Sequence, residues 1–141
     1  MSVETWIKEY MPPITDEIKA DQLKATQHSL NKWKGLLSSN MEKHNICYLT
    51  MISEIDASAE WYPPIGEFGC ALCQYSKRAM LKAPYGSFLF YCDYCPLYKT
   101  LGHNCTQDKS AYDRVNVEHP TDAQVAEMIG ELILVEKALN K

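Results

Sequence analysis

Cys70-Ala71-Leu72-Cys73 and Cys92-Asp93-Tyr94-Cys95 form two Cys-x-x-Cys pairs with 18 residues between them. This spacing is typical of a structural zinc site, in which each pair sits on a tight turn and four thiolates surround one ion. Between the pairs, the Pro84–Gly86 region predicts a turn, and Phe88 to Tyr91 predicts a short strand leading into the second pair. The sequence therefore predicts a zinc-organised module with a small hairpin.

Two further side chains are alternative ligands. His103 and Cys105 follow the second pair in Leu101-Gly102-His103-Asn104-Cys105. Because a closed zinc site needs only four ligands, Cys105 is either spare or replaces a member of a pair. We prefer the paired set as the metal ligands: Cys70, Cys73, Cys92 and Cys95. Cys47 lies in an apolar stretch and is interpreted as a small buried side chain.

The motifs of catalytic zinc are missing from the sequence. A catalytic zinc keeps an open position for water, with a carboxylate base nearby. The chain has no His-Glu-x-x-His motif, and it has no His-x-Glu paired with a Pro-Cys-x-x-Cys. A thioredoxin-like protein would carry one Cys-x-x-Cys near a βαβ pattern, which the sequence does not show. We therefore expect a structural site and no enzyme activity.

Composition sets the class of protein. The 141 residues are 46% hydrophobic and 11% aromatic with a net charge of −4, which fits one compact domain and not a disordered chain. The apolar runs fall far below the roughly 18 residues of a membrane span. The start lacks the basic and apolar regions of a signal peptide. We expect a cytoplasmic protein whose six thiols stay reduced, so that zinc is favoured over disulfides.

The flanking segments predict helices. Pro12-Pro13 interrupts the first helix, and Thr15 or Asp16 can cap the next, which carries an apolar face with Leu30 and Trp33. Ser39-Asn40-Met41-Glu42 is a capping-box pattern that predicts another helix, although Asn45 to Ile52 is also compatible with a strand.

The C-terminal segment gives the clearest prediction. Thr121-Asp122-Ala123-Gln124 is a Thr-x-x-Gln capping box after Pro120, and apolar residues follow at helical spacing from Val125 to Leu139. We expect a core helix that packs on the N-terminal segment. The predicted organisation is a single domain, 1–141, with a helical arm (1–60), a Cys-rich zinc module (66–112) and a C-terminal helix (121–140). The predicted fold is mainly α with a small zinc-knuckle or ribbon insert, thus α+β through one minor hairpin.

Charge bears on the kind of partner. Residues 70–112 hold five basic and two acidic side chains, together with eight aromatic ones, and both flanking segments are acidic. A mixture of basic and aromatic side chains is typical of proteins that bind single-stranded nucleic acid, which would here use Lys77, Arg78 and Lys82. The overall charge of −4 is unlike the basic footprint of such proteins, so nucleic acid is disfavoured. The tyrosines are better interpreted as packing around the zinc.

The motifs together resemble a known group. The chain resembles a loose family of small Cys-rich proteins of tailed phages. The resemblance rests on these motifs: Ser29-Leu30-Asn31-Lys32-Trp33-Lys34, the two cysteine pairs, Pro96, Gly102-x-x-Cys105 and Tyr112. Members place a Lys-Trp helix ahead of a C-A-L-C pair, a C-x-x-C-P pair and a later G-x-x-C; this chain departs from them in its long insert between Trp33 and Cys70. The resemblance implies a phage origin, hence the host cytoplasm, and a metal-organised fold, but no activity.

Three functional hypotheses follow, in order of preference. The first is a non-catalytic, zinc-stabilised protein that binds a host or phage protein. The second is a nucleic-acid-binding zinc module, which would lose affinity steeply with salt. The third is a thiol redox protein, which would need a low-pKa thiolate.

Overall fold

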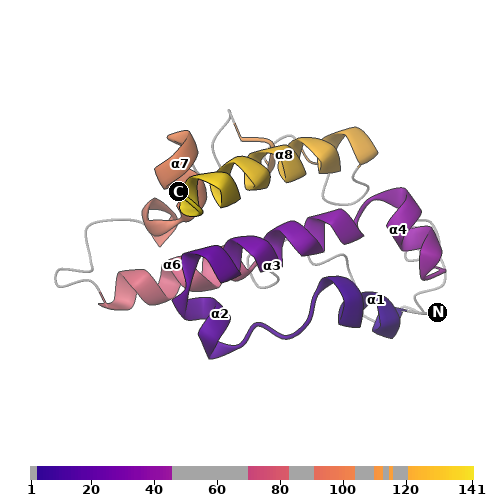
Figure 1. Ribbon diagram of the computed structural model, residues 1–141, viewed down its shortest axis with the longest axis horizontal. Helices are drawn as coiled ribbons and strands as arrows, with labels where there is room; N and C mark the ends of the chain where they lie inside the picture. Colours follow the sequence, from indigo (N-terminus) through magenta and orange to yellow (C-terminus); the bar gives the residue numbers. More distant parts are fainter. Residues whose placement is uncertain (1–2, 46–69, 83–90, 104–109, 113–114, 116–120) are drawn as a thin grey trace.

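The computed structural model describes residues 3–45, 70–82, 91–103, 110–112, 115 and 121–141 (Figure 1). All regular elements in these ranges are helices: α1 (Val3–Tyr10), α2 (Asp16–Ala20), α3 (Gln22–Gly35), α4 (Ser38–Lys43), α6 (Ala71–Lys82), the 3-10 helix η2 (Tyr91–Tyr94), α7 (Pro96–Leu101) and α8 (Asp122–Leu139). Since the described ranges contain no strand, the predicted α+β fold with a minor hairpin is wrong.

The Cys-rich segment shows why that prediction failed. The first cysteine pair opens α6, a helix of 12 residues, and not the turn of a ribbon. Residues 71–82 include no glycine, proline or β-branched side chain and are rich in good helix formers, so local propensity favours the helix. Tyr91, the expected end of the strand, begins η2. The predicted turn and residues 88–90 lie outside the described residues.

Helix α3 occupies the centre of the structure. It packs against α8 on one side and against α1 and α2 on the other, and it also contacts α6 (Figure 1). Trp33 of α3 is 1% exposed and lies edge-on to Tyr112, with ring centroids 6.2 Å apart. The buried core continues through side chains of the surrounding elements: Trp6, Leu36, Leu72, Leu97, Val125, Leu132 and Val135.

The N-terminal breaks fall close to where the sequence predicts them. Helix α1 ends at Tyr10, before Pro12-Pro13, and Thr15 caps α2 by accepting a hydrogen bond from the N–H of Ile18. A further break was not predicted. Asp21 has an extended backbone that ends α2, and its side chain accepts from the N–H of Lys24 at the start of α3 (3.0 Å).

Helix α4 begins in a different way from the prediction. Leu37 occupies its N-cap position without a side-chain cap, so the expected capping box at Ser39–Glu42 is wrong. The backbone N–H and hydroxyl of Ser38 instead donate to one carboxylate oxygen of Asp122, at 2.9 and 2.8 Å. The helix ends at Lys43, and the expected continuation over residues 46–60 lies outside the described residues. The start of α4 is therefore held by a tertiary contact with Asp122 and not by a local capping box.

The C-terminal prediction is confirmed. Thr121 and Gln124 form both hydrogen bonds of a capping box at the start of α8. The inward face of this 18-residue helix buries Val125, Met128, Leu132 and Val135. Neither α8 nor any other helix in the described ranges has the length and apolar character needed to cross a membrane.

Candidate metal centre

The first cysteine pair lies at the start of α6. The carbonyl of Cys70 accepts the first helical hydrogen bond, from the N–H of Gln74 (3.1 Å), so Cys70 stands at the capping position. Cys73 lies one turn along, where its thiol and its backbone N–H both form hydrogen bonds with the Cys70 sulfur. The helix start therefore brings both sulfurs of the pair to one side.

The second pair spans η2 and the start of α7. The N–H of Cys95 donates to the carbonyl of Cys92 (3.1 Å), which closes a tight turn between the two cysteines. Cys95 is then the N-cap of α7, followed by Pro96 in the first turn. The backbone N–H groups of Leu97 and Tyr98 form hydrogen bonds with the Cys95 sulfur, in a setting that is 7% exposed.

The two pairs meet because α6 packs against η2. Ser76, buried on α6 one turn beyond Cys73, shares a hydrogen bond with the Cys95 thiol and donates to the carbonyl of Leu72 (2.7 Å). Cys70 and Cys95 are also close enough for the charge of one sulfur to affect the other. The fold thus brings the sulfurs of Cys70 and Cys95 near each other, although the two residues lie far apart in the sequence.

Helix α3 forms another wall of this cluster. The Ser29 hydroxyl lies 3.7 Å from the Cys70 sulfur, and Ser29 is itself 1% exposed. Neither Ser29 nor Ser76 was predicted as part of the site. No signal in the sequence could have identified them, because a serine on a helix face becomes a sulfur neighbour only through packing.

The surroundings hold the buried thiols in their protonated form. The pKa of Cys70 lies well above its ordinary value because the Cys73 side chain hydrogen-bonds the thiol and burial disfavours charge. Burial, followed by the nearby Cys70, raises the pKa of Cys95 to about 11. A metal ion would have to displace these protons, since thiolates are the ligating form.

The residue types of the two cysteine pairs are those that bind zinc, but their geometry is not that of a closed four-ligand site. Within the described ranges, no three His, Cys, Asp or Glu side chains are disposed to hold a metal ion. The residue types nonetheless fit zinc: there are four cysteine side chains in two Cys-x-x-Cys pairs, of which Cys95 is buried and the others are half-buried. Ligation by all four would require the sulfurs of the two pairs to come closer together than they lie here.

The other predicted candidates have mixed outcomes. Cys47 and Cys105 lie outside the described residues. His103 follows α7, and its buried Nδ1 has no hydrogen-bond partner in the described part of the chain. On α6, the guanidinium of Arg78 lies 4.0 Å from the exposed carboxylate of Asp16, so this base faces an acidic neighbour.

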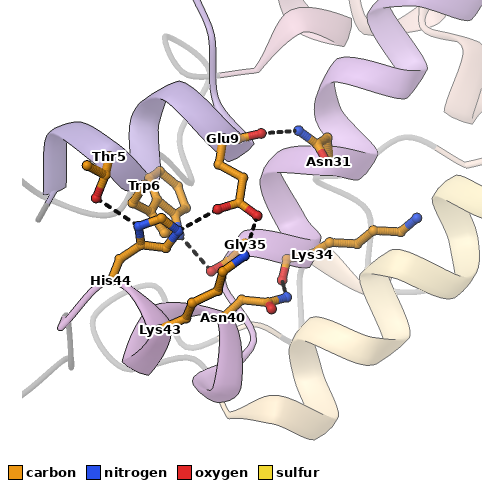
Figure 2. A network of polar contacts seen from close by, with 9 residues as sticks. All are labelled: Thr5, Trp6, Glu9, Asn31, Lys34, Gly35, Asn40, Lys43 and His44. Atoms are coloured by element: carbon orange, nitrogen blue, oxygen red, sulfur yellow. Dashed lines mark hydrogen bonds and ion pairs between the residues drawn. The ribbon is translucent and has the colours of Figure 1, made fainter. Parts of the chain in front are cut away.

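A second polar cluster, which the sequence analysis missed, joins α1 to α4 (Figure 2). The ring of His44 lies between two side chains of α1. Its Nε2 is 2.6 Å from a Glu9 carboxylate oxygen, and its Nδ1 is 2.8 Å from the Thr5 hydroxyl. Because the carboxylate can only accept, Nε2 donates to it, and in the neutral ring Nδ1 accepts from Thr5.

Thr5, His44 and Glu9 are residue types that occur together in catalytic sites, but here their contacts join helices. We call this group the clamp. His44 is 2% exposed and packs edge-on against the Tyr10 ring. The neighbouring bonds also join helices: the Trp6 indole donates to the carbonyl of Gly35 (2.8 Å), and the Asn31 amide donates to that of Glu9 (2.9 Å) (Figure 2). We interpret the cluster as holding α1 against α3 and α4.

No protein-family model, curated protein sequence or solved structure matches the chain. The function proposed next is therefore argued from the residues and their arrangement.

Proposed function

We propose that this chain is a non-catalytic, zinc-stabilised binding protein with Cys70, Cys73, Cys92 and Cys95 as the zinc ligands. One observation carries the proposal: the elements that bear the two Cys-x-x-Cys pairs, 18 residues apart in the sequence, pack together as α6 against η2, and the Ser76 side chain of α6 forms a hydrogen bond with the Cys95 thiol. Each turn also supplies backbone N–H groups to a sulfur, an arrangement that stabilises a bound thiolate.

The role of zinc would be to hold the Cys-rich segment on the helical body. Bound structural zinc contributes directly to folding free energy. Here it would join the start of α6 to the start of α7, two short elements that pack against α3 and α8 respectively. The resulting rigid surface would present a binding face to a protein partner, in keeping with a small protein of phage origin acting in the host cytoplasm.

The two alternatives have less support. A thiol redox protein needs a thiolate of low pKa, whereas the surroundings raise the pKa of Cys70 and Cys95. A nucleic-acid binder needs bases free of acidic neighbours, whereas Arg78 lies beside Asp16 and the chain has a net charge of −4.

The first test is metal content together with thiol accessibility, measured on protein purified without added metal. We expect about one zinc per chain and four protected thiols, the stoichiometry of a closed site. Cys70→Ser and Cys92→Ser should each lose the zinc and the folded state together. Cys47→Ser and Cys105→Ser are matched controls that should keep the zinc, and loss of zinc in Cys105→Ser would instead assign Cys105 as a ligand.

Two results would overturn the proposal. Protein that folds without metal, and whose Cys-x-x-Cys pairs react quickly or form disulfides, would favour the redox alternative. The nucleic-acid alternative would be favoured by two results together. The zinc-loaded protein would bind single-stranded DNA with a steep salt dependence. In a pull-down with Cys70→Ser as the control, it would capture no protein.

A further inference from the structure

The outer face of α8 is unusually apolar. The helix buries its inward face against α3 and lies along one side of the helical body (Figure 1). A helix in this position normally carries polar side chains on the opposite face, and a helix that is apolar all round is normally buried all round. Four of the five exposed residues between Asp122 and Lys137 are nevertheless apolar: Ala123, Ala126, Gly130 and Leu134. This composition indicates that another surface covers the outer face.

Leu134 and Gly130 give this face a definite shape. Leu134 is 54% exposed and is one of three large hydrophobic side chains exposed on the described part of the surface. Gly130 lies one turn earlier, and residues four apart share a helix face. A Cβ at Gly130 would have no atom of the described chain within 4 Å. Glycine is unfavourable inside a helix but allows another chain to approach the backbone closely. The face therefore offers a protruding leucine beside a flat position.

The exposed charges of α8 favour a second copy of the same helix as the covering surface. Asp122 and Glu127 lie near the start of the helix, whereas Lys137 and Lys141 lie at or just beyond its end, and all four are exposed. Two copies of α8 in antiparallel orientation would bring the acidic start of each beside the basic end of the other. A parallel pair would bring like charges together, which is unfavourable at an interface.

One antiparallel register matches both shape and charge. Gly130 and Leu134 are each two residues from Leu132, and Glu127 and Lys137 are each five residues from it. When two helices are paired at the level of Leu132, Leu134 of each copy therefore lies at the height of Gly130 of the other. Glu127 likewise lies at the height of Lys137. Since a carboxylate accepts several hydrogen bonds, this pairing is compatible with contacts of Glu127 inside its own chain.

We propose that α8 forms the interface of a homodimer, in which two copies pair antiparallel and Leu134 of each packs over Gly130 of the other. Such an interface is isologous, because both copies use the same surface. One helix from each copy gives a contact at the small end of specific interfaces, below ~1,200 Å², so we expect dissociation at micromolar concentrations. The inference goes beyond the proposed function and does not depend on zinc, since the interface residues lie outside the Cys-rich segment.

The first test measures self-association of the full chain by analytical ultracentrifugation, from micromolar to near-millimolar concentrations. Leu134→Ala should weaken the dimer about 10- to 100-fold, because each dimer buries two of these leucines. Leu134→Glu should leave only monomer. Leu81→Glu is the matched control, since Leu81 is an even more exposed leucine (81%) on α6, outside the proposed interface. It should dimerise like the unmodified protein.

A charge exchange tests the register. Glu127→Lys places lysines opposite each other in the proposed pair, and Lys137→Glu places glutamates opposite each other, so each variant alone should associate more weakly. A mixture of the two should form a heterodimer with nearly the affinity of the unmodified protein, because every lysine then meets a glutamate. A variant that had merely lost its fold would not regain association on mixing.

Three results would overturn the inference. The unmodified protein could remain a monomer over the whole concentration range, including when the face of α8 is covered by a different protein. Its dimer could withstand Leu134→Glu, which would place the interface elsewhere. The mixture of Glu127→Lys and Lys137→Glu proteins could associate no better than either variant alone. The proposed function is tested separately, since absence of zinc from a dimeric protein would refute the zinc site and leave this interface standing.

Discussion

The hydroxyl of Ser29 lies 3.7 Å from the sulfur of Cys70, although the two residues are 41 positions apart in the chain. This contact makes the central helix α3 part of the cysteine cluster. The segment with the paired cysteines is therefore built into the helical body, and a change at the sulfurs should be felt by the whole fold.

Alkaline pH should destabilise the metal-free protein through Cys95. Its pKa is raised from 9.0 to about 11, mainly by burial, so the folded state keeps a proton that the unfolded thiol loses. This contribution is complete below pH 9 and is lost as the pH rises toward 11, with at most about 2 to 3 kcal/mol involved. Urea unfolding of metal-free protein between pH 8 and 10.5 should show the decline.

Cys95→Ala isolates this effect from that of the tyrosines. Burial also raises the pKa of Tyr10 and Tyr75, and the Cys73 side chain together with burial raises that of Cys70, so part of any alkaline slope belongs to these groups. The variant should be less stable at pH 8 but should show a shallower decline. Parallel pH profiles for the two proteins would contradict the assignment.

Mild acid should destabilise the fold through His28. The pKa of this histidine is lowered, first by burial, although the Pro12 carbonyl accepts a hydrogen bond from its Nε2 (2.6 Å). Protonation would place a hydrogen on the buried Nδ1, which has no acceptor in the described residues. Stability is thus complete above pH 6.5, the ordinary value for histidine, and falls as the pH drops below it.

His28→Gln tests this origin of the acid sensitivity. The glutamine amide can still donate to the Pro12 carbonyl, but it does not titrate. Thermal unfolding between pH 5 and 7.5 should show a smaller acid loss in the variant than in the unmodified protein. An unchanged difference between pH 5 and 7.5 would assign the sensitivity to other groups.

Two glycine substitutions should have opposite effects. A Cβ at Gly35 would lie 2.5 Å from the Cγ of Tyr10, a contact that requires α1 to move away from α3. We expect Gly35→Ala to cost about 1 to 3 kcal/mol. Gly130, inside α8, has open space at the Cβ position, so Gly130→Ala should stabilise by about 0.5 to 1 kcal/mol. Chemical denaturation of both variants checks the sign, and destabilisation by Gly130→Ala would contradict this interpretation of α8.

The clamp between α1 and α4 should depend on its buried member. His44→Ala removes hydrogen bonds to Thr5 and Glu9 and leaves a gap beside Tyr10, and we expect a loss of about 1 to 3 kcal/mol. Lys43→Ala removes an exposed ion pair to the same Glu9 and should change stability by about 0.5 kcal/mol or less. Equal effects in urea unfolding would show that the clamp is not the stabilising element.

Local signals determined much of the helical framework. The capping box at Thr121, the break at Pro12-Pro13 and the cap at Thr15 each depend on residues within four positions of one another, so the sequence alone predicts them. The tight turn expected at each Cys-x-x-Cys pair holds only for the second pair, because the first pair opens α6. The hairpin prediction was wrong because the helix propensity of residues 71–82 outweighed the resemblance of the spacing to a zinc ribbon.

Contacts between distant segments were decided by the tertiary structure alone. Asp122 accepts hydrogen bonds from Ser38 at the start of α4, and a side chain at Gly35 would collide with Tyr10. Ser29 and Ser76 lie beside the sulfurs of Cys70 and Cys95 only because α6 packs against α3 and η2. No feature of the sequence indicates that a given serine will lie beside a thiol. The sequence therefore determined the local helix signals and the spacing of the cysteines, because these depend on neighbouring residues, whereas packing between distant segments decided which hydroxyl groups lie beside the sulfurs.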